Sequence, residues 1–261
     1  MPQMTSPFRL DGKTVLVTGA GGGIGRALVA AFCEAGASVI GADVEPALLA
    51  DLELAGRILF DQADPAATRA AVVEHLEAHG APDAVVANAG FTRAEHFGHL
   101  DDTVWAAELA INLNGAYALT DPIVQAMAKR GGGAVVFISS VNALAHYGNP
   151  AYSAAKAGLV AYSKALAVER GRDGIRSNVV APGSVRTPAW DHRLQADPGL
   201  IGKVLPHYPL GRLVSPVDVA NAAVFLCSDA AAGITGTVLP VDAGLTAGNL
   251  RFVDEVLRPN D

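Results

Sequence analysis

The chain has 261 residues, of which 51% are hydrophobic and 17% are charged, so it can bury a large core and we expect one domain over residues 1–261. A net charge of −7 and a pI near 5.4 argue against nucleic acid and anionic membranes as partners. Two cysteines without zinc-like Cys/His spacing predict neither a disulfide framework nor a metal site. Residues 1–9 lack the apolar core of a signal peptide or membrane anchor, so we expect a cytoplasmic protein.

The N-terminal part of the chain predicts a strand, a glycine-rich turn and a helix. Lys13–Val17 is a short apolar run, the next residues read Thr-Gly-Ala-Gly-Gly-Gly-Ile-Gly, and an apolar helical stretch runs to Phe32. Glycines adopt backbone angles closed to other residues and let the main chain approach a pyrophosphate at a helix N-terminus. The turn therefore predicts dinucleotide binding at Gly19, Gly23, Ile24 and Gly25.

A second strand is predicted at Ala37–Ala42, and it ends at Asp43. A carboxylate about 20 residues beyond the glycines can accept hydrogen bonds from a ribose diol, whereas it would repel a 2′-phosphate. Asp43 therefore predicts that NAD is preferred over NADP.

The remaining elements continue the alternation of strands and helices. Further strands are predicted at Arg57–Phe60, Asp83–Val86, Ala134–Ile138, Gly174–Val180 and Thr237–Val241. A long helical pattern over residues 101–128 is interrupted at Asn112–Gly115, and another helix begins after an N-cap at Ser215 and runs to about Ser228. From Pro188 to Pro209 the pattern weakens, which predicts an irregular lobe at about residues 188–212. The order indicates an α/β, doubly wound Rossmann fold with a seven-stranded parallel sheet and helices on both faces.

Tyr152 and Lys156 are four residues apart in a helical pattern, so their side chains share one face. A nearby cation favours the phenolate form of a tyrosine, which can then transfer a proton near neutral pH. Ser140 follows the strand that ends at Ile138, where the strand would deliver its hydroxyl to the carboxyl edge of the sheet. Serine, tyrosine and lysine together predict a hydride-transfer site.

With these motifs the chain resembles the short-chain dehydrogenase/reductase family in its compact, single-domain, NAD-dependent form, from about Leu10 to Gly244. Two positions depart from the family pattern: Ala87 stands where a second asparagine is usual, and Ala243 where a glycine is usual. The resemblance implies an active-site asparagine next to the catalytic set and further cofactor contacts. These residues are Asn112 beside Ser140, Tyr152 and Lys156; Asp61 and Gln62 near the adenine; the turn of Asn88, Ala89 and Gly90; Tyr152 and Lys156 themselves; and Pro182, Gly183, Val185 and Thr187 near the nicotinamide carboxamide.

Two serines adjoin at the catalytic position. The family spacing to the tyrosine is often thirteen, which points to Ser139, but the second serine of the motif is normally the catalytic one. We therefore prefer Ser140 and leave Ser139 as the alternative.

The predicted function is NAD(H)-dependent interconversion of a secondary alcohol and a ketone, with Tyr152 as general base or acid. A sugar or polyol, a hydroxy acid and a cyclic alcohol all remain possible substrates. Loop side chains that could hydrogen-bond such a substrate, or that are only surface residues, are Arg93, His146, Tyr147, Trp190 and His192. The alternatives are a 3-oxoacyl-carrier-protein reductase and, from another class, a non-catalytic NAD-binding module.

The resemblance also implies a homotetramer. The segment Ala151–Ala167 is rich in alanine and glycine on more than one helical face, which permits close approach of a second helix. A C-terminal tail at about residues 249–261 carries apolar residues beyond the family core, so we expect it to pack on a neighbouring subunit. The alternative is a frayed terminus.

Overall fold

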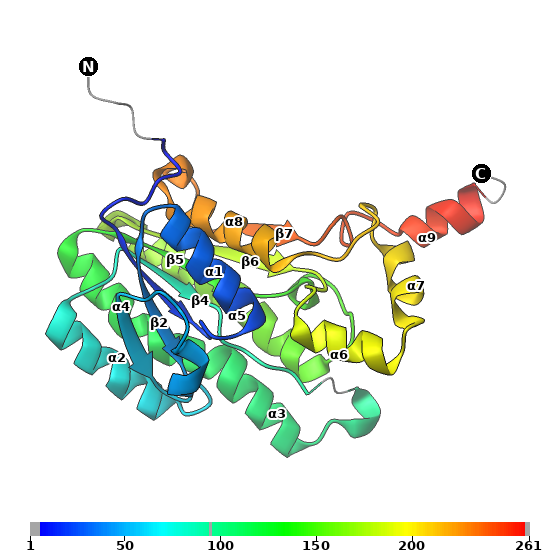
Figure 1. The fold of residues 1–261 in the computed structure, drawn as a ribbon, viewed down its shortest axis with the longest axis horizontal. Coiled ribbons are helices and arrows are strands. Elements are labelled where there is room, and N and C mark those ends of the chain that lie inside the picture. The colour runs from blue at the N-terminus through cyan, green and yellow to red at the C-terminus, as the bar shows by residue number, and fades with distance from the viewer. Residues whose placement is uncertain (1–5, 94–95, 259–261) are drawn as a thin grey trace.

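Seven parallel strands form one sheet in the order β3-β2-β1-β4-β5-β6-β7, in a computed structural model that describes residues 6–93 and 96–258 (Figure 1). This confirms the predicted seven-stranded Rossmann-like sheet. The strand order reverses between β1 and β4, which is where open parallel sheets bind their ligands. The strands are β1 (Thr14–Thr18), β2 (Ser38–Asp43), β3 (Gly56–Leu59), β4 (Ala84–Ala87), β5 (Gly133–Ile138), β6 (Ile175–Pro182) and β7 (Val238–Val241).

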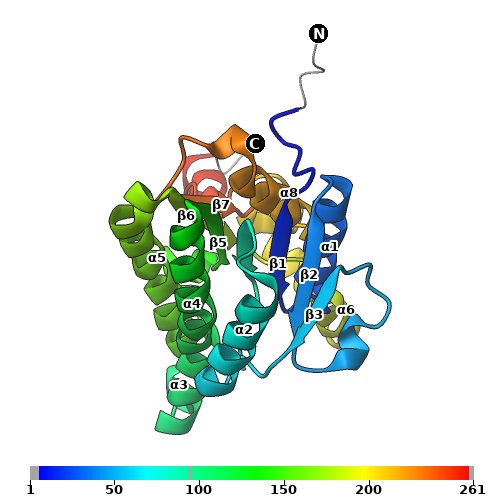
Figure 2. The ribbon, with the colours of Figure 1, turned by 90° about the vertical axis from the view of Figure 1, so that its left-hand side faces the viewer.

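Helices cover both faces of this sheet (Figure 2). On one face α1 (Gly23–Glu34) and α8 (Pro216–Cys227) pack on Val15 and Val17 of β1. On the other face α2 (Pro65–His79), α4 (Gly115–Arg130) and α5 (Pro150–Arg170) share a second core with Leu16 of the same strand. Because successive residues of a strand face opposite sides, both cores need apolar residues, and the strands read as continuous apolar runs.

The predicted interruption of the long helix is a π-helical turn. α3 (Asp102–Leu109) leads into η3 (Ala110–Asn114), and α4 follows from Gly115. A Cβ atom on Gly115 would lie 2.1 Å from the carbonyl oxygen of Gln62, so glycine is required for this close approach. Such single π turns occur often at functional sites.

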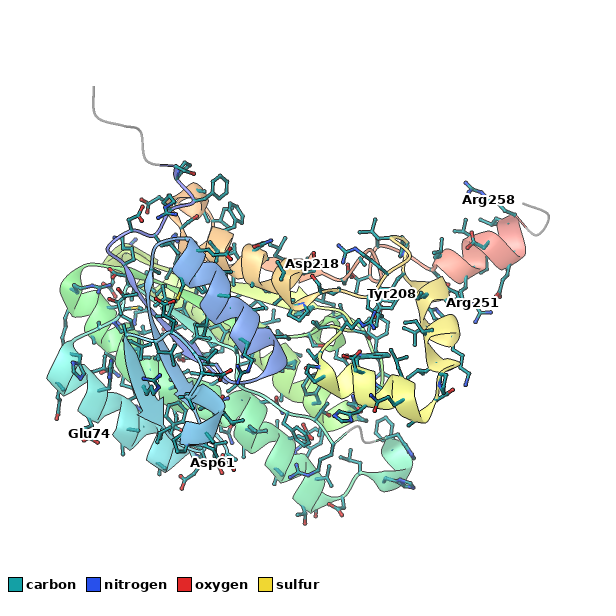
Figure 3. All side chains as sticks on the ribbon, viewed as in Figure 1. Asp61, Glu74, Tyr208, Asp218, Arg251 and Arg258 are labelled. Atoms are coloured by element: carbon teal, nitrogen blue, oxygen red, sulfur yellow. The ribbon has the colours of Figure 1, made fainter. Side chains whose placement is uncertain are left out.

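The segment predicted to be irregular is instead mostly helical. It contains α6 (Pro188–Ala196), α7 (Leu200–Val204) and the short 3-10 turn η6 (Leu205–His207). None of these three elements has a buried residue in the part of the chain that the structure describes, which explains why no helical apolar stripe marked them. Tyr208, labelled in Figure 3, anchors the end of this lobe, because its buried hydroxyl accepts the backbone N–H of Ser184 at 3.0 Å.

Other local predictions concern helix N-termini. The Ser215 hydroxyl accepts the backbone N–H of Asp218, while the Asp218 carboxylate accepts the backbone N–H of Ser215, so this capping box opens α8 as predicted. Asp64 caps α2 in a similar way, with proline at the first helical position.

The departure at Ala243 leads to a stability prediction. Ala243 has a φ of +53°, in the left-handed region where a side chain costs about 1–2 kcal/mol. Ala243→Gly should therefore stabilise the protein by ~0.5 kcal/mol after the extra chain entropy of glycine, raising Tm by about 1–2 °C. Calorimetry should show the opposite sign for the control Ala70→Gly, at an exposed position inside α2, with a loss of up to ~1 kcal/mol. A lower Tm for Ala243→Gly would contradict the argument.

Candidate active site

A cleft of about 480 Å³ opens at the carboxyl edge of the sheet, beside β1, β2 and β4. It lies at the reversal of strand order noted above. Among the sequence-predicted cofactor residues, those that line it are Gly19, Gly23, Ile24, Gly25, Asp43, Asp61, Gln62, Asn88, Ala89, Gly90 and Thr187. The structure therefore brings these residues together around one cavity.

The glycine turn between β1 and α1 is shaped by close backbone approaches. Gly19 has a φ of +61°, and a Cβ atom on Gly25 would lie 1.9 Å from the carbonyl oxygen of Gly19. A larger residue at either position would force the turn apart. Because the turn leads directly into the N-terminus of α1, it fits the pyrophosphate of a dinucleotide.

The turn after β4 is tied to the glycine turn. The Asn88 side chain donates to the carbonyl oxygens of Thr18 and Gly19 at 2.8 and 3.3 Å. The Thr18 hydroxyl in turn accepts the backbone N–H groups of Asn88 and Ala89 at 3.1 and 3.0 Å. Asn88 thus holds the turn in place although Ala87 precedes it.

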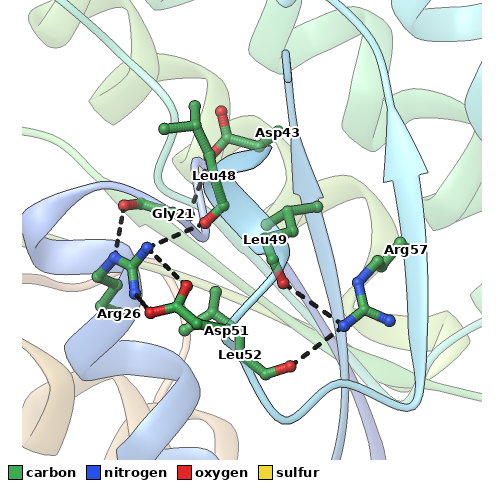
Figure 4. Close-up of polar contacts among 8 residues, drawn as sticks. All are labelled: Gly21, Arg26, Asp43, Leu48, Leu49, Asp51, Leu52 and Arg57. Carbon is green, nitrogen blue, oxygen red and sulfur yellow. Dashed lines mark hydrogen bonds and ion pairs between the residues drawn. The ribbon is translucent and has the colours of Figure 1, made fainter. Parts of the chain in front are cut away.

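Asp43 at the end of β2 faces the glycine turn (Figure 4). Its carboxylate accepts the backbone N–H of Gly21 at 2.9 Å. It also accepts the backbone N–H of Val44 at 2.8 Å. Nearby, Arg26 makes a two-pronged contact with Asp51, at 2.8 and 3.0 Å, and also donates to the carbonyl oxygens of Gly21 and Leu48. The Asp43 carboxylate is therefore held by backbone amides at the wall of the cleft.

Asp61 and Gln62 are placed differently from one another. Asp61 lines the cleft, and its carboxylate accepts the backbone N–H of Ala63. The buried Gln62 side chain donates to the carbonyl oxygens of Ala89 and Ile111, linking the turn after β4 to the π turn η3. Gln62 thus supports the cleft from behind, besides lining it.

A second pocket, of about 340 Å³, shares Ile24, Asn88 and Gly90 with the cofactor cleft. Other residues that line it come from the ends of β4, β5 and β6 and from the first turns of α5. They are Phe91, Thr92, Ile138, Ser139, Ser140, Tyr152, Lys156, Pro182, Gly183 and Val185. The predicted catalytic serine, tyrosine and lysine therefore meet in one pocket beside the cleft.

The two adjacent serines point to different partners. The Ser140 hydroxyl hydrogen-bonds the Tyr152 side chain and also accepts the backbone N–H of Asn142 at 3.1 Å. The Ser139 hydroxyl donates to the carbonyl oxygen of Lys156 at 2.9 Å, inside the fold. This geometry favours Ser140 over Ser139 as the residue beside the tyrosine.

The pKa values of Tyr152 and Lys156 differ from what the sequence led us to expect. Tyr152 is partly exposed at the pocket, but burial of its hydroxyl raises its pKa to about 12, while its hydrogen bond with Ser140 lowers the pKa and the charge of Glu108 raises it. Burial lowers the pKa of Lys156 to about 8, against the raising effect of Glu108. The Lys156 ammonium lies 5.5 Å from the centre of the Tyr152 ring and donates to the carbonyl oxygen of Ile138 at 3.0 Å. Burial therefore dominates the pKa of Tyr152, contrary to our expectation that the lysine would lower it.

Asn112 is buried in the π turn, next to this pocket. Its amide nitrogen donates to the carbonyl oxygen of Phe91 at 2.7 Å, and its side-chain oxygen accepts the Phe91 backbone N–H at 3.2 Å. These two bonds fix the orientation of the carboxamide, with Nδ2 toward the Phe91 carbonyl oxygen and Oδ1 toward the Phe91 N–H. They also tie η3 to the segment that follows β4.

The sequence-predicted substrate residues are not among those that line the second pocket. Arg93, His146, Tyr147 and His192 are exposed, and Trp190 packs under the guanidinium of Arg193 at 4.6 Å. The pocket is instead lined by Phe91 and Thr92, from the segment that also holds Arg93. The sequence therefore indicated the segment that reaches the pocket, but not that Phe91 and Thr92 are its lining residues.

Comparison with known proteins places these features in a family. The family model described as "Enoyl-(Acyl carrier protein) reductase" matches residues 19–246. The chain is 41% identical to the Schizosaccharomyces pombe protein described as "Uncharacterized oxidoreductase C922.06", over 97% of this chain and 98% of that protein. It is 35% identical to the 3-oxoacyl-[acyl-carrier-protein] reductase FabG of Thermotoga maritima, over 91% and 99% of the two chains.

Solved structures agree with this placement. An oxidoreductase of the short-chain dehydrogenase/reductase family from Burkholderia thailandensis is 43% identical, with a TM-score of 0.87 over 94% of this chain and 97% of that chain. A gluconate 5-dehydrogenase from Burkholderia cenocepacia, in complex with NADP and tartrate, is 31% identical, with a TM-score of 0.85 over 93% and 98%. The chain therefore belongs to the short-chain dehydrogenase/reductase family, and it is an oxidoreductase of a family that binds a nicotinamide cofactor.

Two further observations concern residues 6–93 and 96–258. No helix there is both long and apolar enough to cross a membrane. No group of three or more His, Cys, Asp or Glu side chains there is arranged to hold a metal ion.

Sequence reasoning missed several residues of the site. Leu48, Phe60 and Ile111 line the cofactor cleft, but nothing in the sequence separates them from ordinary core residues. Glu108 is different, because an acidic residue one helical turn before Asn112, within an apolar helical pattern, was a visible signal.

Proposed function

We propose that this protein is an NAD(H)-dependent oxidoreductase that interconverts a secondary alcohol and a ketone. The observation that carries the proposal is the hydrogen bond between the Ser140 hydroxyl and Tyr152, with Lys156 beside them, in a pocket that shares a wall with the cofactor cleft. A proton-transfer group next to a nicotinamide site is what alcohol oxidation requires.

The residues divide the chemistry as follows. In the oxidative direction the Tyr152 phenolate takes the hydroxyl proton of the alcohol, and Ser140 holds the same oxygen by a hydrogen bond. When bound, a nicotinamide would accept the hydride that leaves the carbinol carbon. Lys156 contributes positive charge, which favours the phenolate form of Tyr152. Ketone reduction uses the same groups in reverse, with Tyr152 as the acid.

The preference for NAD rests on Asp43 and its surroundings. Its carboxylate stands at the cleft wall, where a 2′-phosphate would meet a negative charge. Arg26, which could in principle neutralise a phosphate, is instead engaged by Asp51 and two carbonyl oxygens, and Arg57 donates to the carbonyl oxygens of Leu49 and Leu52 (Figure 4). These contacts support NAD, although the gluconate 5-dehydrogenase described above binds NADP.

The alternatives to this function are a carrier-protein reductase and a non-catalytic NAD-binding module. A 3-oxoacyl-carrier-protein reductase is favoured by the description of the family model and by the FabG relative. However, such enzymes usually use NADPH and need a basic rim for an acidic carrier, whereas this chain carries a net charge of −7 and Asp43. A non-catalytic NAD-binding module would need the glycine turn but not a serine, tyrosine and lysine gathered in a pocket.

Turnover against a panel of polyols, hydroxy acids, cyclic alcohols and a 3-oxoacyl thioester, read as NADH or NADPH absorbance, tests the proposal. Oxidation of one or more alcohols with NAD would support it. Activity confined to the thioester with NADPH would favour the carrier-protein reductase, and binding of NAD without any turnover would favour the non-catalytic module.

We also propose a tetramer in the cytoplasm, with a role for the C-terminal tail. The exposed residues at positions 154, 157, 161 and 165 of α5 are alanines, whose small side chains allow a second helix to pack closely against this surface. The tail forms α9 (Leu250–Phe252) and η8 (Val253–Leu257), which extend away from the sheet beside α7 (Figure 1), with Arg251 and Arg258 labelled in Figure 3. Its residues Phe252, Val256 and Leu257 are exposed, which supports packing on a neighbour; residues 259–261 lie outside the described residues.

Light scattering should give a mass near four chains of 26.7 kDa. Deletion from Leu250 onward should lower that mass or change KM, because apolar side chains that cover a neighbour would be lost. A monomer would refute the assembly. Unchanged mass and kinetics after the deletion would refute the role of the tail.

A further inference from the structure

A buried carboxylate beside the catalytic residues has no part in the chemistry above. Glu108 lies in α3, one helical turn before Asn112, and its side chain is 0% exposed. A buried carboxylate destabilises a fold unless hydrogen bonds or a counter-charge compensate it. The groups that surround the Glu108 carboxylate therefore indicate what it does.

The Glu108 carboxylate holds two segments of the active site. One oxygen, Oε1, accepts the backbone N–H of Arg93 at 2.8 Å, and the other, Oε2, accepts from the Nδ2 of Asn112 at 3.0 Å. Since Asn112 is also bonded to Phe91 through both ends of its carboxamide, the pair fixes the backbone of residues 91–93. Phe91 and Thr92 of this segment line the catalytic pocket.

The same carboxylate acts on the catalytic lysine. A Cβ atom on Gly90 would lie 2.7 Å from the Asn112 side-chain oxygen and 3.1 Å from the Lys156 ammonium, so these two groups flank one glycine. Burial lowers the pKa of Lys156, and the negative charge of Glu108 opposes that lowering. Among residues 6–93 and 96–258, two further ionisable groups lie nearby: Tyr152, whose ring centre is 5.5 Å from the ammonium, and Arg93, whose guanidinium is 3.9 Å from the Glu108 carboxylate.

We propose that Glu108 is a positioning residue: its carboxylate fixes the carboxamide of Asn112 and keeps the amine of Lys156 charged during hydride transfer. The part that concerns turnover rests on the proposed function. The part that concerns the charge of Lys156 does not, because it can be measured without substrate or cofactor.

Two substitutions separate charge from shape. Glu108→Gln keeps the shape but removes the charge, and its amide NH2 must face a donor, either the Arg93 backbone N–H or the Asn112 Nδ2. Glu108→Asp keeps the charge but leaves a gap of one methylene group. If charge and acceptor oxygens matter, kcat at pH 7 should fall roughly tenfold or more in the Gln variant, and less in the Asp variant. If Glu108 only fills space, the order is reversed.

The matched control is Asp102→Asn, which removes one negative charge from an exposed position on the same helix. It should keep the kcat and the pH profile of the wild type. In the Gln variant the high-pH limb of the oxidation profile should move to lower pH, because the Lys156 ammonium is then lost at lower pH.

The substrate-free test is an NMR titration of the lysine ε-carbons. The chain has five lysines, and Lys156→Met assigns the resonance of interest. In wild type the titration of Lys156 should centre near a pKa of about 8, and in Glu108→Gln its midpoint should be lower. A lower midpoint without turnover of any panel compound would reject the proposed function and leave the role of Glu108 standing.

An unchanged or higher midpoint in the Gln variant would overturn the proposal, as would a Gln variant more active than the Asp variant. If the Gln variant does not fold, the Asp variant decides. A Lys156 titration midpoint near that of wild type in Glu108→Asp supports the proposal, and a midpoint well below that of wild type overturns it.

Discussion

Tyr152→Phe is expected to lower kcat for alcohol oxidation about a thousandfold while NADH binds as it does in wild type. The phenylalanine ring keeps the packing beside Lys156, whose ammonium lies 5.5 Å from the ring centre. Only the hydroxyl is lost, and a positioned acid or base contributes about 10²–10⁴-fold to such reactions. Turnover measured by NADH absorbance and affinity measured by NADH fluorescence check the two halves of this expectation.

The control for this variant is Tyr162→Phe. Tyr162 lies in the same helix, and its hydroxyl accepts a hydrogen bond from Thr120 at 3.3 Å, outside the catalytic pocket. It should turn over like wild type. A Tyr152→Phe variant with activity within tenfold of wild type would remove Tyr152 from its proposed role.

The raised pKa of Tyr152, about 12, also predicts how the two directions of the reaction depend on pH. With this pKa Tyr152 is a neutral phenol at pH 7, which suits the reductive direction, where Tyr152 donates a proton. Oxidation requires the phenolate, so it depends on added positive charge from Lys156 and from oxidised nicotinamide. We therefore expect the wild-type oxidation rate to rise with pH up to the point where Lys156 loses its proton, and the residual rate of Tyr152→Phe to lose that rise.

Much of the fold and of the cofactor cleft could be predicted from sequence because the signals are local. The glycine turn and Asp43 are short patterns with a specific physical meaning. The four-residue spacing of Tyr152 and Lys156 is weak by itself and becomes informative only together with the other motifs of the chain. The parallel sheet could be predicted because its strands are continuous apolar runs. Strands buried on both faces lack the alternation of apolar and polar residues that is typical of half-exposed strands. Family resemblance then supplied the positions that have no local signal of their own, such as Asn112.

The parts that the sequence could not supply depend on contacts between distant segments. Glu108 and Arg93 are fifteen residues apart, and Gln62 reaches Ile111 across forty-nine. The residues of α6 and α7 whose burial the structure describes are all at least partly exposed, so no buried apolar stripe marks these helices in the sequence. Which residues of the segment after β4 line the pocket could not be predicted for the same reason, because Asn112 and Glu108 hold the backbone of residues 91–93 from a distant helix.

The second large effect concerns cofactor choice. The double variant Asp43→Ala and Val44→Arg should shift the ratio of kcat/KM for NADP over NAD by about a hundredfold or more. Removing the carboxylate ends the repulsion of a 2′-phosphate, and the arginine supplies a charge-assisted partner. If each change is worth about tenfold, or 1.4 kcal/mol, the two together give that ratio.

Two single variants separate charge from structure in this prediction. Asp43 also accepts the backbone N–H groups of Gly21 and Val44, so alanine loosens the glycine turn and should lower activity with both cofactors. Asp43→Asn keeps an acceptor oxygen and removes the charge, so it should relax the preference at a smaller cost in rate. Glu45→Gln, an exposed neighbour that loses the same charge, should leave the preference unchanged. If the wild-type protein already prefers NADP, or if Asp43→Asn leaves the preference as it was, the Asp43 carboxylate does not select the cofactor. In that case Arg26 must be released from Asp51, its partner in Figure 4, when the cofactor binds.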